Sequence, residues 1–172
     1  IMRQDAGING DAQRIEQMTW MFFLKVYDTQ EETWEYKDEN YKSIIPEDLR
    51  WRKWAVDEKD GEALTGEALL SFVNEKLFPT LKNLPIDANT PRAKSIVLET
   101  FADLNQYMKN GTLLRQVVNI VNEIEFDDAD DRHTFGDIYE GILKDLQSAG
   151  NAGEFYIPRA LTDFMVMMLD TK

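Results

Sequence analysis

Apolar residues recur every three to four positions after Asp11, and this spacing is typical of one face of an α-helix. In the stretch DAQRIEQMTWMFFLKVYD the stripe consists of Ile15, Met18, Phe22 and Val26, and Trp20, Met21 and Leu24 broaden it. The pattern predicts a nearly buried helix that Asn9 or Asp11 caps. The charged stretch that follows, TQEETWEYKDENYKS, is compatible both with an exposed continuation of this helix and with an irregular segment.

The next predicted helix follows a turn at Pro46, a short helical piece and a polar loop. It begins near Thr65, and Pro79 is expected to kink or end it, because proline lacks an amide donor and clashes with the preceding turn. Its apolar face consists of Leu69, Phe72, Val73 and Leu77.

Two more helices are predicted between Thr90 and the acidic part of the chain. Thr90 followed by Pro91 is a capping residue with a first-turn proline, and Asn110-Gly111 is expected to close the helix that they open. The second helix lies in TLLRQVVNIVNEI. The two apolar faces consist of Val97, Phe101, Leu104 and Met108, and of Leu114, Val117, Val118, Val121 and Ile124.

The acidic linker EFDDADDRH separates these helices from another amphipathic stretch, which Gly150 ends. Its apolar residues at helical offsets are Phe135, Ile138, Tyr139, Ile142, Leu143 and Leu146. Convincing alternation of apolar and polar residues, which would indicate strands, is absent throughout. The sequence therefore predicts an all-α fold, a helical bundle of about six helices.

Composition narrows the possible functions. The chain has 172 residues, no cysteine and a formal charge of -13. Disulfides and Cys-ligated zinc are excluded, and the longest apolar runs are far shorter than the roughly 20 residues that span a bilayer. A cytoplasmic protein without membrane contact is the expectation. Because so acidic a body repels phosphate, contact with DNA would need other chains.

The segment RWRKW, Arg50 to Trp54, is the one place where cations and indoles alternate. This chemistry suits stacking on bases and contact with phosphates. The other interpretation, which the acidic surroundings favour, is that a tryptophan packs on the bundle while the arginine stems cover it. If this domain meets nucleic acid or another subunit, RWRKW is the expected place.

Other candidate sites are weaker. His133 is the only histidine and lies in the acidic linker, where a solvated or capping role is favoured over catalysis or metal binding. The run DDADD lacks the glycine and glutamate of a calcium loop, so a solvated linker is favoured. No Ser-His-Asp arrangement, phosphate loop or Gly-x-Gly-x-x-Gly motif supports a hydrolase, kinase or dinucleotide-binding function.

The stretch GNAGEFYIPR combines a glycine-rich loop, a carboxylate and two aromatic residues just before a helix that starts at Pro158. Free amides at a helix N-terminus, together with aromatic faces, can hold a small ligand that has a carboxylate or an adenine. An ordinary helix–loop–helix connection with aromatic plugs explains the same residues.

Two motifs, in this order and separation, resemble one protein family. FGDIYEGILKDLQSAGNAGEFYIPRALTDFMV is similar to the region before the cofactor loop in the modification subunits of type I restriction-modification systems, which are adenine-N6 DNA methyltransferases. INGDAQRIEQMTWMFFLKVYD resembles the opening of their helical N-terminal domain, and LRWRKWA falls where that domain carries a similar aromatic segment. The resemblance covers nearly the whole chain.

The resemblance implies two parts: a helical N-terminal assembly domain at residues 1–130, and the truncated start of an α/β methyltransferase domain at residues 131–172. In the family, the motif EFYTPR lies against S-adenosylmethionine. The matching positions, which are the expected cofactor contacts, are Glu154, Phe155, Tyr156, Ile157, Pro158 and Arg159. Ile157 replaces the threonine usual in the family, which would cap the helix, and losing a cap typically costs about 1 kcal/mol.

The implied partners are the specificity subunit, a second modification subunit, the restriction subunit where a system has one, and double-stranded DNA in the assembled complex. The family's glycine-rich cofactor loop and its Asn-Pro-Pro-aromatic motif do not occur in these 172 residues, so no catalytic residue is predicted and the chain alone is expected to be inactive. The alternative is an acidic helical adapter that binds proteins and has no enzymatic activity.

Overall fold

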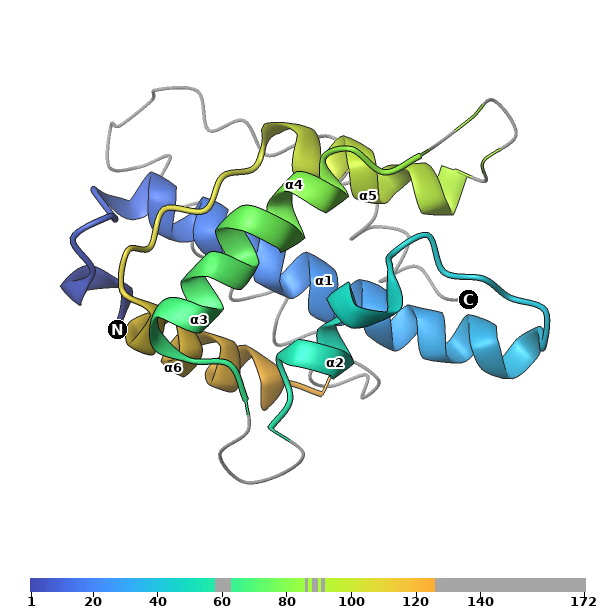
Figure 1. The fold of residues 1–172 in the computed structure, drawn as a ribbon, viewed down its shortest axis with the longest axis horizontal. Coiled ribbons are helices and arrows are strands. Elements are labelled where there is room, and N and C mark those ends of the chain that lie inside the picture. Colours follow the sequence, from blue (N-terminus) through green and yellow to red (C-terminus); the bar gives the residue numbers. More distant parts are fainter. Residues whose placement is uncertain (58–62, 86, 88–89, 91, 126–172) are drawn as a thin grey trace.

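In the computed structural model, helices pack around one long central helix, α1 (Figure 1). The structure describes residues 1–57, 63–85, 87, 90 and 92–125. Within these ranges every regular element is helical, which confirms the predicted all-α fold for this part of the chain. The elements are η1 (Met2–Gln4), α1 (Asp11–Lys37), η2 (Glu47–Leu49), α2 (Trp51–Trp54), α3 (Gly66–Ser71), η3 (Phe72–Leu77), α4 (Phe78–Leu81), α5 (Arg92–Asp103) and α6 (Gly111–Asn122).

The charged stretch TQEETWEYKDENYKS continues the helix in its first part, because α1 runs without a break to Lys37. The predicted cap is wrong. The helix begins after Gly10, which has a φ of 108° and no capping side chain. The amide of Asn9 instead donates to Oε1 of Gln13 at 2.6 Å, and Asp11 pairs with Arg14 inside the first turn.

The predicted stripe of α1 enters the core only in part, because Trp20, Met21 and Leu24 are buried with Ile15 while its other members lie at the edge of the core. Ile15 is buried, but Met18, Phe22 and Val26 are only half-buried. The fully buried residues of α1 beyond Ile15 are Gln17, Thr19, Trp20, Met21, Phe23, Leu24, Tyr27, Asp28 and Glu31. Because α1 carries apolar residues on both sides, the period alone could not tell which side faces the core.

Pro79 neither ends nor interrupts the run of helix from Gly66 to Leu81. The π-helical segment η3 precedes it, and the amide of Phe78 donates to the carbonyl of Val73, five residues back. Pro79 then falls at the start of α4, where its missing amide is tolerated.

The connection between α5 and α6 also differs from the prediction. The helix α5 ends at Asp103, and Asn110 opens α6 instead of closing α5, because its Oδ1 accepts from the amides of Thr112 and Leu113, both at 3.0 Å. The carboxylate of Asp5 holds this connection by accepting from the amides of Lys109 and Asn110, both at 2.9 Å.

Two helix starts meet backbone to backbone where α3 and α6 pack together. A Cβ atom built on Gly111 would lie 1.8 Å from the carbonyl oxygen of Gly66. Gly66 itself has a φ of 56°, a left-handed conformation that glycine adopts without strain. The glycines therefore set how closely α3 and α6 approach.

The core is aromatic at its centre. Trp20 of α1 packs edge-on against Phe78 of α4 at 5.3 Å between ring centroids, and Phe78 packs against Phe101 of α5 at 5.2 Å. Leu114, Val117, Val118 and Val121 are buried on α6, as its spacing predicts, whereas Ile124 lies after the helix end and is half-buried. None of the helices in the described ranges has the length and apolar character needed to cross a membrane.

Candidate functional site

Of the sequence-predicted sites, only RWRKW lies within the described residues. The expected cofactor contacts from Glu154 to Arg159, His133 and the DDADD run all lie outside them. The geometry of the first site can therefore be built from the structure, while the cofactor contacts stay a prediction.

Both tryptophans of RWRKW are buried in the core, so neither indole is offered to a base. Trp51 is 1% exposed and Trp54 is 4% exposed. Nε1 of Trp51 donates to Oδ1 of Asn122 at 3.1 Å, and Nε1 of Trp54 donates to the carbonyl of Leu49 at 3.2 Å. This confirms the packing interpretation of RWRKW.

The two arginines of RWRKW turn toward carboxylates on α1. Nη1 of Arg50 contacts Oε1 of Glu35 at 2.6 Å, and Nη1 of Arg52 contacts Oε2 of the same residue at 3.2 Å. Glu32 and Glu47 add further ion pairs at the rim. We call the two arginines and their carboxylate partners the α1–α2 joint. Its members are Arg50, Arg52, Asp28, Glu31, Glu32, Glu35 and Glu47.

Asp28 caps α2 from another helix. Its Oδ2 accepts from the amide of Arg52 at 3.2 Å, and its Oδ1 accepts from Nε of the same arginine at 3.0 Å. A helix of four residues is not stable by itself, because it has too few internal hydrogen bonds. The carboxylate of Asp28 stabilises it by accepting from one of its free amides. The sequence carried a signal: Asp28, Glu31 and Glu35 recur at offsets of three and four, which places them on one face of α1.

Glu31 is a carboxylate with no exposed surface. The hydroxyl of Tyr41 donates to its Oε1 at 2.8 Å, and Nε of Arg50 lies 3.8 Å from its Oε2. Burial raises the pKa of Glu31, although hydrogen bonds from Ser43 and Tyr41 and the charge of Arg50 oppose this. Burial likewise raises the pKa of Asp28, against hydrogen bonding and charge from Arg52.

These raised pKa values predict how stability changes with pH. A carboxyl whose pKa is higher in the folded state binds more protons there than in the unfolded chain. The contribution of Asp28 and Glu31 to the free energy of unfolding should therefore fall as pH rises from about 4, the ordinary carboxyl value, through their raised values. Glu31→Gln removes one of these titrating groups and keeps an acceptor for Tyr41. The free energy of unfolding of this variant should therefore depend less on pH than that of the parent.

Urea unfolding between about pH 4 and pH 8 measures this difference. Glu67→Gln is the matched control, because Glu67 is exposed on α3 and should keep the parent's slope. Parallel curves for Glu31→Gln and the parent would contradict a raised pKa at Glu31.

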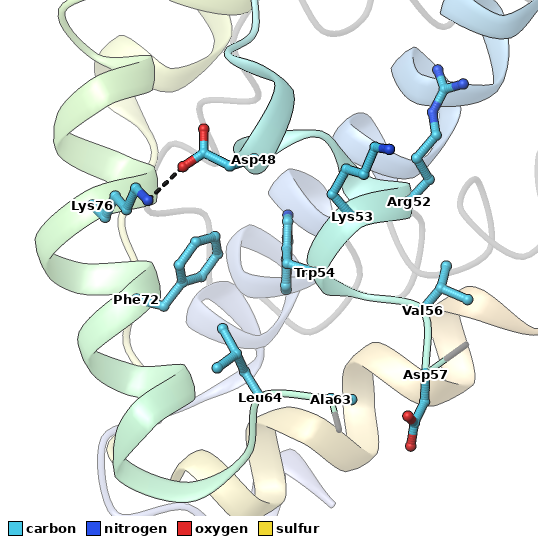
Figure 2. Close-up of a pocket in the computed structure, with 10 residues that line it drawn as sticks. All are labelled: Asp48, Arg52, Lys53, Trp54, Val56, Asp57, Ala63, Leu64, Phe72 and Lys76. Carbon is cyan, nitrogen blue, oxygen red and sulfur yellow. Dashed lines mark ion pairs between the residues drawn. The ribbon is translucent and has the colours of Figure 1, made fainter. Parts of the chain in front are cut away.

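A hollow of about 370 Å³ lies beside α2 (Figure 2). Trp54 and Phe72 lie side by side in its lining, with 5.5 Å between ring centroids. An ion pair between Lys76 and Asp48, at 2.5 Å, lies at one end. Its lining residues are Asp48, Arg52, Lys53, Trp54, Val56, Asp57, Ala63, Leu64, Phe72 and Lys76.

The charges around this hollow are balanced. Lys53 pairs with Glu47 at 3.0 Å, as Arg52 does with Asp28 and Lys76 with Asp48. Hydrogen bonding from Lys76 holds the pKa of Asp48 below its usual value. Because each of the three lining cations already has a carboxylate partner, the hollow lacks the excess positive charge that a phosphate would need.

Arg115 of α6 ties the segment after α2 to the bundle. It is 8% exposed, and it donates to the carbonyls of Trp54 at 3.0 Å, Ala55 at 2.7 Å and Leu64 at 2.8 Å. Burial lowers its pKa, and the charge of Asp57 opposes this. Sequence reasoning missed this residue, because an arginine among valines on a helix gives no sign of which carbonyls it will reach.

The described residues hold structural joints and no catalytic constellation. Across the described ranges, no three His, Cys, Asp or Glu side chains are grouped so that they could hold a metal. The arginines of the α1–α2 joint form ion pairs with its carboxylates. RWRKW thus attaches α2 to α1 through its buried tryptophans and paired arginines.

Comparison with known proteins identifies the family. The family model described as HsdM N-terminal domain matches residues 1–121, and the model described as N-6 DNA Methylase matches residues 130–172. The type I restriction enzyme EcoEI methylase subunit of Escherichia coli is 59% identical over 174 aligned positions, which are 100% of this chain and 34% of that protein.

Two solved structures share the fold. A modification subunit from Vibrio vulnificus YJ016 is 33% identical with a TM-score of 0.72, over 98% of this chain and 38% of that one. A chain from a type I R-M system, studied for complex assembly and conformational transition, is 34% identical with a TM-score of 0.74, over 98% and 33%. This chain thus spans about a third of the length of these relatives. It belongs to the family of modification subunits of type I restriction-modification systems, with an HsdM N-terminal domain at residues 1–121.

Proposed function

We propose that this chain is the N-terminal part of a DNA methylation subunit that transfers a methyl group from S-adenosylmethionine to N6 of adenine in host DNA. The observation that carries the proposal is the order of the two family matches, an HsdM N-terminal domain followed directly by an N-6 DNA Methylase region. An acidic adapter without enzymatic parentage leaves the second match unexplained. The proposed division is an assembly domain at residues 1–130 and the start of the catalytic domain at residues 131–172.

The proposed cofactor contacts are the residues from Glu154 to Arg159. Their chemistry suits S-adenosylmethionine: a carboxylate for hydroxyl or amino groups, the rings of Phe155 and Tyr156 for an adenine face, and amides ahead of Pro158 for the amino-acid carboxylate. The cofactor supplies the methyl group on its sulfonium. Ile157 offers no hydroxyl, so this position contributes shape alone.

The helical domain serves assembly with the specificity subunit and a second modification subunit, and engages DNA only in the complex. Three observations support this. The chain carries a net charge of -13, the tryptophans of RWRKW are buried, and its arginines are paired with carboxylates. A surface of this kind is suited to protein contacts and not to gripping phosphates unaided. The cytoplasm, where host DNA lies, is the proposed location.

A methyl-transfer assay tests the proposal. The chain of 172 residues is expected to transfer no labelled methyl group from S-adenosylmethionine to duplex DNA, because the Asn-Pro-Pro-aromatic motif is not among its residues. A whole modification subunit that carries this chain, mixed with its specificity subunit, is expected to label adenine. Turnover by the chain alone would contradict the first expectation, and labelled cytosine or no labelling by the whole complex would contradict the proposed function.

A further inference from the structure

The central helix α1 has a second apolar face. At about 100° per residue, Tyr27 lies opposite Met18, and Leu24 lies opposite Phe22. Tyr27 and Leu24 are buried at 0% and 1% exposure, whereas Met18, Phe22 and Val26 pack against the edge of the core and keep part of their surface exposed. We call these three residues the outer face of α1. A helix that is apolar on opposite sides is typically covered on both.

The end of α6 is fastened beside this outer face. Nζ of Lys25, which shares the arc of Met18 and Phe22, donates to the carbonyl of Asn122 at 3.3 Å and to its Oδ1 at 3.4 Å. Nε1 of Trp51 donates to the same Oδ1 at 3.1 Å. An ammonium group at the carbonyl end of a helix is favourable, so the contact fixes where the chain leaves α6.

The segment that follows has a matching pattern. Residues 123–134 are mostly polar and acidic, and the next apolar residues, Phe135, Ile138, Ile142 and Leu146, recur every three to four positions. A stripe with this spacing can cover the outer face of α1 by the ridge-into-groove packing of two helices. The twelve residues from 123 to 134 reach about 40 Å when extended, which suffices to bring the stripe back along α1.

We propose that the outer face of α1, Met18, Phe22 and Val26, is the docking surface for residues 135–146 of this same chain. The first amphipathic segment of the methylase region then packs on the helical domain, and Lys25 and Asn122 set the point from which it is delivered. The docking would connect the helical domain to the methylase region through the outer face of α1. The inference concerns packing alone and holds whether or not the proposed methylation is correct.

Hydrogen exchange measured by mass spectrometry on the full chain tests the docking. Amides in residues 135–146 are expected to be protected in the parent, and Met18→Lys and Val26→Lys are each expected to speed their exchange about tenfold or more, since a docked segment exchanges by local opening. Ile120→Lys is the matched control, because Ile120 is 52% exposed on α6 and should leave this exchange unchanged. Residues 114–121 report whether the bundle stays folded, and Met18→Gln and Val26→Gln replace the lysine variants if it does not.

A reciprocal measurement uses the chemistry of the surface itself. Ile138→Lys and Ile142→Lys are expected to raise the rate of Met18 oxidation by peroxide several-fold, because the covering segment is released. Unprotected amides at residues 135–146 in the parent would overturn the proposal. So would protection that survives both outer-face variants, or that Ile120→Lys removes instead.

Discussion

Gly111→Ala is expected to destabilise the helical domain by about 3 kcal/mol or more, because the new methyl group has no room. Its Cβ would lie 1.8 Å from the carbonyl oxygen and 2.4 Å from the carbonyl carbon of Gly66, and backbone atoms cannot rotate away as a side chain can. Relief requires α3 and α6 to move apart. That movement opens the contact along Leu69, Leu114 and Val118, which are all fully buried.

The measurement is the urea midpoint of Gly111→Ala against the parent. A domain of this kind has a total stability of about 5–15 kcal/mol, so the shift should be large. Gln116→Ala, on the exposed side of the same helix, is the matched control and should be nearly neutral. A stability for Gly111→Ala within about 0.5 kcal/mol of the parent would show that the two helix starts do not touch in solution.

Arg115→Met is expected to cost about 3–4 kcal/mol, because it leaves several buried acceptors without a donor. The guanidinium group serves the carbonyls of Trp54, Ala55 and Leu64, and also Oδ1 of Asn119 at 3.3 Å. Methionine fills a similar volume and so tests the hydrogen bonds more than the packing. Arg115→Lys should recover only part of the lost stability, since one ammonium group cannot reach the three carbonyls that the wider guanidinium group contacts together.

Thermal unfolding and hydrogen exchange together check this expectation. The amides of residues 51–55 should exchange faster in Arg115→Met, because the end of α2 loses its attachment to α6. Arg3→Met is the control, since Arg3 is exposed near the N-terminus. Equal stability of Arg115→Met and the parent would mean that water satisfies these carbonyls.

The helices were predictable from spacing wherever one side of the helix is apolar and the other is polar. The helix α6 is the clear case, because Leu114, Val117, Val118 and Val121 are buried as predicted. In α1 the spacing picks out Met18, Phe22 and Val26, which are only half-buried, while the residues that broaden the stripe, such as Leu24, are fully buried together with Tyr27. Periodicity finds a stripe, but ranking two stripes requires knowing which neighbours each one meets.

Local signals misled where one residue type serves two purposes. Asn110 was expected to close a helix, yet asparagine caps N-termini at least as well, and here it opens α6. The buried charges were hidden for a different reason. Asp28 and Glu31 stand in a stretch as acidic as any solvated surface, and only the arrival of Arg50 and Arg52 from another element makes their burial tolerable. The prediction for Glu154 to Arg159 concerns residues outside the described ranges and stays a prediction.

The π-helical segment η3 changes the register of the rod that contains it. A π turn uses one residue more than an α turn, so every side chain after it lies about 100° behind the position that it would have in a regular α-helix. Before η3 the rod faces α6, and after it the rod faces α5, where Phe78 meets Phe101. One continuous helix from Gly66 to Leu81 can thus serve two neighbours that a regular α-helix of the same sequence could not serve together. Removing a single residue from Phe72–Leu77 would let a regular α-helix span this stretch with Phe78 still turned toward Phe101, whereas forcing regular α-helix on the full sequence would turn Phe78 away.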